Sequence, residues 1–349
     1  MELPRHDPEP PPETRRGGSF VSARQVADLA GVSRSAVSRA FTAGASVSEE
    51  TRRKVMKAAE SLGYHVNHLA RSLIHESSGI VCIVGAALHT PHQGRFLDAV
   101  TRRLQSIDRV AMVINTSGDS ASVEAALRQT LNYRADATVV LSGAPPASLV
   151  DTCLRSGQHV IVINRDDQFA GAQEISVDND GAAREAFHIL FRAGCRNMAV
   201  VTSNAGTPSL VERERTFRRT AVEAGLEVSV TRAGPTSYDS GYAAAKELLS
   251  GSRRPDAAFC VTDLLACGFL DCARAEFGMK VPDELCVVGF DDIEQAGWAS
   301  YGLTTFGQPA DAIADSIGAL LQAGGQGVPG KPRISFPASL VWRRTVRPR

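Results

Sequence analysis

The sequence predicts an all-α helix-turn-helix head followed by an α/β body of two doubly wound lobes. A chain of 349 residues is too long for one ordinary core. Short helical segments, punctuated by serines and glycines, occupy the first sixty-odd ordered residues. From Gly79 onward, short apolar β-rich runs alternate with amphipathic segments of helical length. The change in secondary-structure pattern at Gly79 separates the head from the body.

Bulk composition is typical of a folded protein of the cytoplasm. Apolar residues make up 43% and charged residues 22% of the chain. The best apolar run, residues 80–88, is far too short to span a membrane. Residues 1–18 carry Pro, Glu and Arg where a signal peptide would be apolar. The seven cysteines show no CxxC spacing, so we expect reduced thiols and no metal site.

Residues 1–18 are expected to form a disordered tail, and residues 19–65 a compact head. Serine caps predict where the three helices of the head begin: Ser22 (in a capping box with Gln25), Ser33 and Ser48. Glycines end the first and third helices, at Gly31 and Gly63. Apolar side chains at helical spacing are expected to form the core that the three helices share: Val26, Ala27, Leu29, Ala30, Ala36, Val37, Ala40, Val55, Ala58, Ala59 and Leu62.

The first two helices have the spacing of a helix-turn-helix motif, with Gly31 in the turn. In that geometry the second helix enters the major groove of DNA with its first residues toward the bases. Those residues are Arg34 and Ser35, and Arg39 follows one turn later. An arginine fork can bind guanine O6 and N7 together. Each arginine could equally contact phosphate alone, which sets register without reading sequence.

Charge is unevenly distributed along the chain. Between Arg15 and His75 there are ten Lys or Arg and four Asp or Glu, a net charge of +6. Because the whole chain is neutral, the remainder carries −6. A basic module on a mildly acidic body suits a head that binds a polyanion.

The body reads as two consecutive α/β units. The first unit has expected strands at 80–85, 110–115, 137–141 and 160–164, with helices near 96–107, 123–131 and 147–155. The second has strands at 198–203, 228–230, 257–261 and 285–290, with helices near 182–193, 211–224, 242–249 and 264–277. Ligands of such sheets bind beyond the carboxyl ends of the strands, so we expect a site between two lobes.

Several long motifs, in order, make the chain resemble the lactose/galactose-repressor (LacI) family of bacterial regulators from Phe20 to Val346. The matching segments are 26–41 (VADLAGVSRSAVSRAF), 47–64, 67–73 (NHLARSL), 175–190, 213–217 (RERTF), 260–270, 287–293 (VVGFDDI) and 303–309. The resemblance implies a homodimeric repressor that binds a pseudo-palindromic operator DNA and responds to a small-molecule effector. It also implies a periplasmic-binding-protein-like sensor as the body. The implied divisions are a hinge at 66–78, an N-lobe at 79–178 and 309–330, and a C-lobe at 179–308 and 331–349.

The resemblance assigns roles to residues that match the family's motifs. Its DNA contacts fall on Arg34, Ser35, Ser38 and Arg39 of the recognition helix and on Asn67, Ala70 and Leu73 of a hinge helix. Leu73 takes the place of the residue that wedges open a base step in the minor groove, which bends the DNA.

For the effector, the resemblance points to Arg213 and Asp291. An arginine and an aspartate facing one cleft suit a polyhydroxy ligand, whose hydroxyls donate and accept hydrogen bonds. From the residues alone, Asp291 and Asp292 could equally be a loop pair at the end of a strand. We expect Asp263 to cap the helix it begins rather than to contact ligand.

Two segments depart from the family's pattern. Residues 90–96 read Thr-Pro-His-Gln-Gly-Arg-Phe, where the family has Asn-Pro and aromatic side chains, so His92 or Gln93 is expected to line the cleft. Residues 64–67 lack the proline that opens the family's hinge helix, so its ordering on operator DNA is expected to be less sharp.

Two other classes of function compete with a regulator. A pure small-molecule carrier would have a signal peptide and no helix-turn-helix. An enzyme on a doubly wound fold would show a GxGxxG turn, a P-loop or a Gly-x-Ser-x-Gly elbow, and none occurs in its expected place. We therefore expect no catalytic residues and no cofactor.

Overall fold

The structure is a computed structural model in which residues 21–42, 44–65, 77–142, 145–164, 169–324 and 333–348 are described. Two compact units divide the chain, Met1–Glu76 and Ser77–Arg349. The expected tail at 1–18 and the expected hinge residues Asn67, Ala70 and Leu73 lie outside the described residues.

The head consists of α1 (Ala23–Ala30), α2 (Arg34–Ala40) and α3 (Glu49–Leu62). The three predicted serine caps are confirmed: the side chains of Ser22, Ser33 and Ser48 each accept a hydrogen bond from the main-chain N–H three residues later. Gly31 ends α1 with φ 66°, a left-handed conformation that glycine adopts without strain. The turn between α1 and α2 is therefore fixed locally by the sequence.

The core of the head consists of small apolar side chains. The buried ones are Val26, Ala27, Val37, Ala40, Val55, Ala58 and Ala59, and Leu62 packs at their margin. Leu29 is an exception, because its side chain is 57% exposed. The side chains at the helix crossings are small, and this allows three short helices to pack closely.

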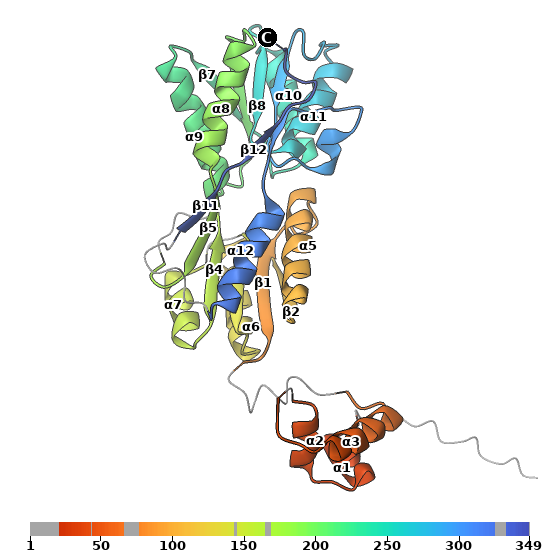
Figure 1. The fold of residues 1–349 in the computed structure, drawn as a ribbon. Helices are drawn as coiled ribbons and strands as arrows, with labels where there is room; N and C mark the ends of the chain where they lie inside the picture. Colours follow the sequence, from red (N-terminus) through yellow and green to blue (C-terminus); the bar gives the residue numbers. More distant parts are fainter. Residues whose placement is uncertain are drawn as a thin grey trace, which may run out of the picture. The chain divides into compact units, whose positions relative to one another are not determined.

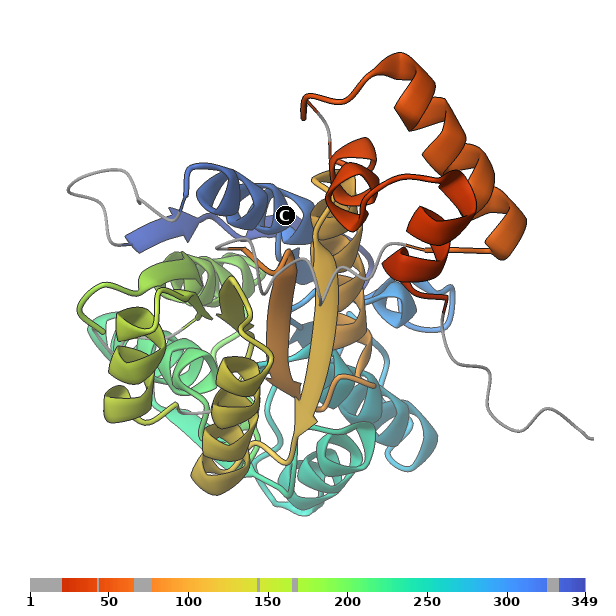
Figure 2. The ribbon, with the colours of Figure 1, turned by 90° about the horizontal axis from the view of Figure 1, so that it is seen from below.

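In the body, the first lobe is built on a six-stranded parallel sheet in the order β11-β5-β4-β3-β1-β2 (Figure 1). Its strands are β1 (Ile80–Ala86), β2 (Val110–Thr116), β3 (Ala137–Val140), β4 (His159–Ile163), β5 (Gln173–Val177) and β11 (Arg333–Phe336). Its helices are α5 (Pro91–Ser106), α6 (Ser120–Asn132), α7 (Ala147–Arg155) and α12 (Ala310–Gln322). Figure 2 shows helices on both faces of this sheet.

The second lobe has a four-stranded parallel sheet in the order β7-β6-β8-β9. Its strands are β6 (Met198–Thr202), β7 (Val228–Arg232), β8 (Ala257–Cys260) and β9 (Cys286–Val288). The helices are α8 (Asn179–Arg192), α9 (Pro208–Glu223), α10 (Tyr238–Ser250), α11 (Asp263–Ala275) and the short 3-10 helix η1 (Glu294–Gly297). An antiparallel pair, β10 (Thr305–Gly307) and β12 (Ser339–Val341), completes the body.

One predicted boundary between the lobes is wrong. The segment from 331 onward was assigned to the C-lobe, but Arg333–Phe336 forms β11 and pairs in parallel with β5 of the first sheet. The chain returns to the second lobe only after Phe336. Alternation of exposed and half-buried residues in β11 explains the error, because an edge strand lacks the apolar run of a buried parallel strand.

The large apolar core joins both lobes and includes stacked phenylalanine rings. Phe217 of α9 lies 5.0 Å from Phe259 of β8, centroid to centroid, and both side chains are fully buried. Among the described residues, no helix is long and apolar enough to cross a membrane.

Candidate functional site

The recognition helix α2 presents its polar side to solvent. Arg34, Ser35, Ser38 and Arg39 are all exposed, whereas Val37 and Ala40 of the same helix are buried. Nε of Arg39 donates to the main-chain oxygen of Ser35 at 3.3 Å, so this side chain lies along the helix surface. The four predicted DNA contacts in α2 therefore share one accessible surface, and whether they bind DNA stays a prediction.

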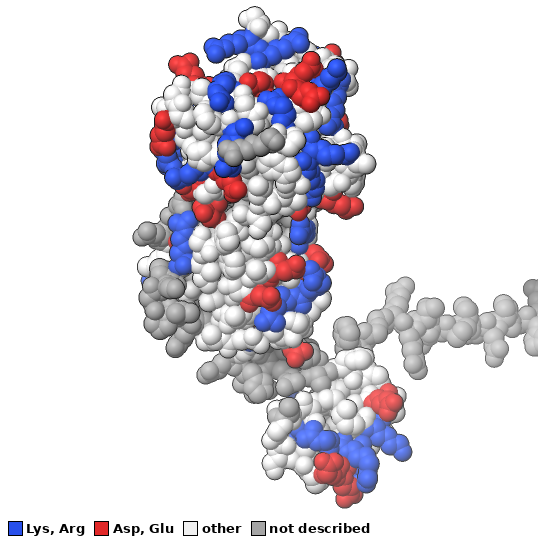
Figure 3. All heavy atoms as spheres, turned by 45° about the horizontal axis from the view of Figure 1, so that its top comes forward, with Lys and Arg blue, Asp and Glu red and all other residues white. Residues whose placement is uncertain are grey.

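Charged side chains cover part of the head. Figure 3 shows a group of Lys and Arg side chains on this unit with acidic side chains beside them. Lys54 and Glu50 on α3 form an exposed ion pair at 2.8 Å. Such exposed pairs contribute little to stability, so the cations stay available to a polyanion.

In the body, the three predicted effector contacts converge. His92 comes from α5 of the first lobe, Arg213 from α9 of the second, and Asp291 from the segment after β9. Oδ1 of Asp291 lies 3.8 Å from Nη1 of Arg213 and 3.9 Å from Nδ1 of His92. Residues that are 199 positions apart are thus brought together where the two lobes meet.

Arg213 is held firmly by its surroundings. Its Nε donates to Oδ1 of Asn179 at 2.8 Å and its Nη1 to the main-chain oxygen of Val261 at 2.8 Å. The guanidinium carbon lies 3.4 Å from the centroid of the Phe290 ring, a cation–π contact. Burial lowers the pKa of Arg213 to about 10, while the Asp291 charge opposes that effect. The side chain therefore stays cationic at neutral pH, and these two bonds use only two of its five N–H groups.

The structure distinguishes between Asp291 and its neighbour Asp292. Asp291 is 8% exposed and accepts a hydrogen bond from Nε2 of Gln308 at 2.8 Å. Asp292 turns to Arg343, whose Nη2 lies 2.7 Å from its Oδ1. Asp291 has φ 118°, a conformation that costs a non-glycine residue free energy and is found at functional sites. Only Asp291 of the two faces the cluster.

His92 joins the cluster as a neutral acceptor. Burial lowers the pKa of His92, the Asp291 charge raises it, and the charges of Arg213 and Arg95 lower it further. Nε2 of His92 lies 3.4 Å from the amide nitrogen of Gln308, which places the ring proton on Nδ1, toward Asp291. The imidazole therefore connects the first lobe to the carboxylate of the second.

Asp263 does not cap its helix, so that prediction is wrong. Thr262 is the N-cap residue of α11, and the fully buried carboxylate of Asp263 accepts hydrogen bonds from Oγ1 of Thr305 at 2.6 Å and from the main-chain N–H of Ile293 at 3.0 Å. Burial and the Asp291 charge raise its pKa to about 7, although those bonds lower it. A Cβ at Gly289 would lie 2.1 Å from Oδ1 of Asp263, so only glycine fits there.

Two residues of this cluster were missed by sequence reasoning, Gln308 and Asn179. Gln308 is 6% exposed and bridges His92 and Asp291, while Asn179 orients Arg213. The only signal was their place in segments that follow strands of the two lobes. Asp178 caps α8, because its Oδ1 accepts a hydrogen bond from the N–H of Gly181 at 2.8 Å.

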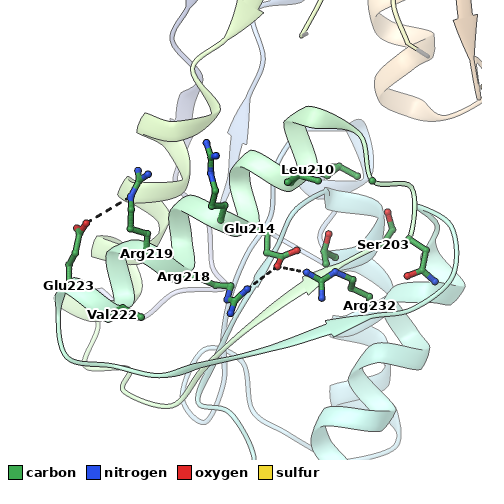
Figure 4. A pocket seen from close by; sticks show the side chains of 13 residues that line it. Ser203, Leu210, Glu214, Arg218, Arg219, Val222, Glu223 and Arg232 are labelled. Atoms are coloured by element: carbon green, nitrogen blue, oxygen red, sulfur yellow. Dashed lines mark hydrogen bonds and ion pairs between the residues drawn. The ribbon is translucent and has the colours of Figure 1, made fainter. Parts of the chain in front are cut away.

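A cavity of about 740 Å³ lies elsewhere, on the outer side of α9 (Figure 4). Glu214 sits in its wall, 9% exposed, with its Oε1 in contact with an N–H group of Arg232 and 3.5 Å from Nη1 of Arg218. None of the predicted effector residues lines this cavity. Because Arg213 is on the opposite side of α9, the cavity and the cluster are separate places.

Comparison with known proteins decides the family. The profile "Bacterial regulatory proteins, lacI family" matches residues 23–67, and "Periplasmic binding protein-like domain" matches residues 187–346. The chain therefore carries a lacI-family domain of bacterial regulatory proteins, joined to a periplasmic-binding-protein-like domain. The first profile covers the helix-turn-helix, and the second covers most of the second lobe.

Three curated relatives match most of the chain's length. It is 26% identical to the HTH-type transcriptional regulator DegA of Bacillus subtilis over 93% of this chain and 97% of that one. It is 29% identical to the HTH-type transcriptional regulator CelR of Thermobifida fusca, over 85% of this chain and 89% of CelR. A third relative is the HTH-type transcriptional repressor PurR of Escherichia coli, 26% identical over 85% and 88%.

Solved structures share the fold. The lac repressor dimer bound to operator and the anti-inducer ONPF aligns with a TM-score of 0.84 and 23% identity, over 94% of this chain and 99% of that one. The CelR–cellobiose complex aligns with a TM-score of 0.68 and 26% identity, over 93% of this chain and 99% of the CelR chain. The predicted fold class is confirmed. The helix-turn-helix profile and the curated relatives make the chain an HTH-type transcriptional regulator rather than an enzyme.

Proposed function

We propose that this regulator binds a pseudo-palindromic operator as a homodimer and that a small polar metabolite, such as a sugar or polyol, controls that binding from between the lobes. The observation that carries the proposal is the convergence of His92, Arg213 and Asp291 from two lobes on one point. A guanidinium, a carboxylate and an imidazole together offer donors and acceptors for hydroxyl groups. The site of action would be the cytoplasm, where operator DNA is.

Two relatives support the proposal by what was bound to them. The lac repressor dimer was solved on operator DNA, and CelR was solved with cellobiose. For this chain, ligand would change lobe closure and thereby alter whether two hinge helices can meet. Coupling of this kind amounts to about 1–3 kcal/mol and requires different ligand affinities in the two states.

Exposed apolar side chains support the homodimer. Val110 is 62% and Val113 is 43% exposed on β2, an edge strand of the first lobe. Apolar edge strands are avoided in monomers because they invite association. We expect sedimentation to show a dimer and a joint Val110→Glu, Val113→Glu variant to show a monomer. A wild-type chain that stays monomeric at operator-binding concentrations would refute the homodimer.

The DNA part is tested with an operator selected from random DNA. Arg34→Ala is expected to relax base preference by about 1–3 kcal/mol in fluorescence anisotropy against operator and random duplexes. Leu73→Ala is expected to weaken operator binding far more than random-DNA binding. Arg53→Ala, an exposed arginine on α3, serves as control and is expected to affect both duplexes alike. Equal losses on both duplexes for Arg34→Ala and Leu73→Ala would contradict these roles.

The effector part is tested by adding sugars, polyols and nucleobases to the protein–operator complex. One class should shift operator affinity, and Asp291→Asn should abolish the response while operator binding persists. Glu185→Gln, an exposed change on α8 away from that cavity, should respond like wild type. A full response from Asp291→Asn would place the effector elsewhere, for example in the cavity outside α9.

A further inference from the structure

The cavity on the outer side of α9 has the size and the position of a small-molecule site. Its volume of about 740 Å³ falls within the range of about 300–1,000 Å³ that is usual for such sites. Thr202, the last residue of β6, and Arg232, the last residue of β7, both line it and are partners in the parallel register. The cavity therefore lies beyond the carboxyl ends of two neighbouring strands, where doubly wound sheets bind ligands.

The wall of this cavity carries a positive charge. Its charged side chains sum to +2, and they are Arg215, Arg218, Arg219, Arg232, Glu214 and Glu223. Arg219 is already held by acidic side chains, at 2.7 Å from Asp180 and 3.9 Å from Glu223. Arg215 has no hydrogen-bond or ion-pair partner within the described residues. The positive charge that remains available to a ligand is therefore on Arg215, Arg218 and Arg232.

One carboxylate, that of Glu214, holds two of these arginines side by side. Its Oε1 contacts Nη2 of Arg232 from β7 and lies 3.5 Å from Nη1 of Arg218 on α9 (Figure 4). The Glu214 side chain is 9% exposed, whereas both arginine side chains are about half exposed. In the part of the chain that the structure describes, neither guanidinium has a second partner. Each therefore keeps N–H groups that can donate to another carboxylate.

Apolar side chains lie beside these arginines. Four lining residues of α9 follow the spacing i, i+4, i+7 and i+11 and so share one face of the helix: Val211, Arg215, Arg218 and Val222. Val211 is 50% and Val222 is 69% exposed, and the buried Leu210 also lines the cavity. A ligand that matches this wall has an anionic group and an apolar body.

We propose that the cavity outside α9 binds a small organic acid, with its carboxylate between Arg218 and Arg232 and its apolar body against the valines of α9. The ligand adds a second negative charge where one carboxylate now serves two cations. Glu214 competes with the ligand for both arginines and so limits its affinity. This site is separate from the recognition helix and from the cluster at Asp291, and it depends on neither assignment.

Isothermal titration calorimetry on the full chain tests the site, with benzoate and octanoate as probes. Acetate has the carboxylate without the apolar body, and benzyl alcohol has the ring without the charge. We expect at least one probe to bind once per chain, and acetate and benzyl alcohol to bind at least about tenfold more weakly than that probe. The proposal is overturned if neither probe binds, or if acetate, benzyl alcohol or inorganic phosphate binds as tightly as the better probe.

Substitutions in the wall should change the affinity in opposite directions. Arg232→Gln should weaken binding of the better probe at least about tenfold, because the ligand loses a charge-assisted hydrogen bond. Glu214→Gln should tighten it at least about threefold, because the internal competitor loses its charge. Arg253→Gln, an exposed arginine of the same lobe outside the cavity, should keep the wild-type affinity. Unchanged binding in Arg232→Gln, or weaker binding in a folded Glu214→Gln protein, contradicts the assignment; thermal unfolding checks the fold of each variant.

Asp291→Asn distinguishes this site from the cluster between the lobes, which also contains an arginine. Removing the Asp291 charge leaves Arg213 without its nearby carboxylate, so an acid bound at the cluster would bind more tightly. For an acid bound outside α9, we expect the wild-type affinity. A change of more than about threefold in Asp291→Asn would place the acid at the cluster and overturn the proposal.

Discussion

Protonation of Asp263 should govern part of the pH dependence of stability. Its carboxyl is fully buried, and its pKa rises from an ordinary 3.8 to about 7. The folded state therefore binds a proton more tightly than the unfolded state. The stabilisation is fully present below about pH 4 and is lost as pH rises through about 7. A rise of roughly three pKa units corresponds to about 4 kcal/mol of unfolding free energy.

Urea unfolding of wild type and Asp263→Asn, over a series from about pH 4 to about pH 8, measures this effect. An asparagine carries no titrating proton, so the variant should lack that part of the pH dependence. The difference in unfolding free energy between the two proteins should therefore change by up to about 4 kcal/mol across the series, in favour of the variant at high pH. Asp239→Asn, an exposed change on the same lobe, controls for general charge effects. Parallel curves for wild type and Asp263→Asn would refute the reasoning.

Other substitutions test the packing and capping of both parts by urea unfolding. Arg213→Ala should lower the unfolding free energy by about 3–5 kcal/mol, because it leaves a buried carboxylate without its cation, whereas exposed Arg215→Ala should stay within about 0.5 kcal/mol of wild type. Val37→Ala should destabilise the head by about 1–3 kcal/mol, measured as loss of α-helical circular dichroism on heating, since it opens a cavity in a small core. Ser48→Ala should cost the head about 1 kcal/mol through loss of the α3 cap, and an unchanged melting temperature would contradict that. Glu214→Gln should lower the unfolding free energy by about 1 kcal/mol. The loss should be smaller at high salt, because the two arginine partners of Glu214 are half exposed and salt screens the ion pairs.

Local features of the head were predictable residue by residue. The serine caps, the glycine ends and the inner valines and alanines all depend on neighbours within a few positions, so their pattern survives in the sequence. The alternation of strands and helices in the body was predictable for the same reason. Leu29 shows the limit, because an apolar side chain at helical spacing still faces solvent here.

Long-range pairing was not predictable from local pattern. β5 was not among the predicted strands, and β11 was placed in the wrong lobe, because these strands mix polar and apolar residues and become stable only by pairing within the sheet. The role of Asp263 failed for a similar reason: at the start of a helix a carboxylate looks like a cap, and only the approach of Thr305 and the Ile293 N–H turns it inward.

The sequence alone determined a helix-turn-helix head, two α/β lobes, and Arg213 and Asp291 as a matched pair of candidate contacts. Tertiary structure alone decided that His92 reaches that pair from the other lobe and that Gln308 bridges His92 and Asp291. The physical reason is the separation along the chain of the residues that interact. Caps and amphipathic faces are set by residues a few positions apart, whereas a buried polar cluster is assembled by side chains that meet only once both lobes have packed.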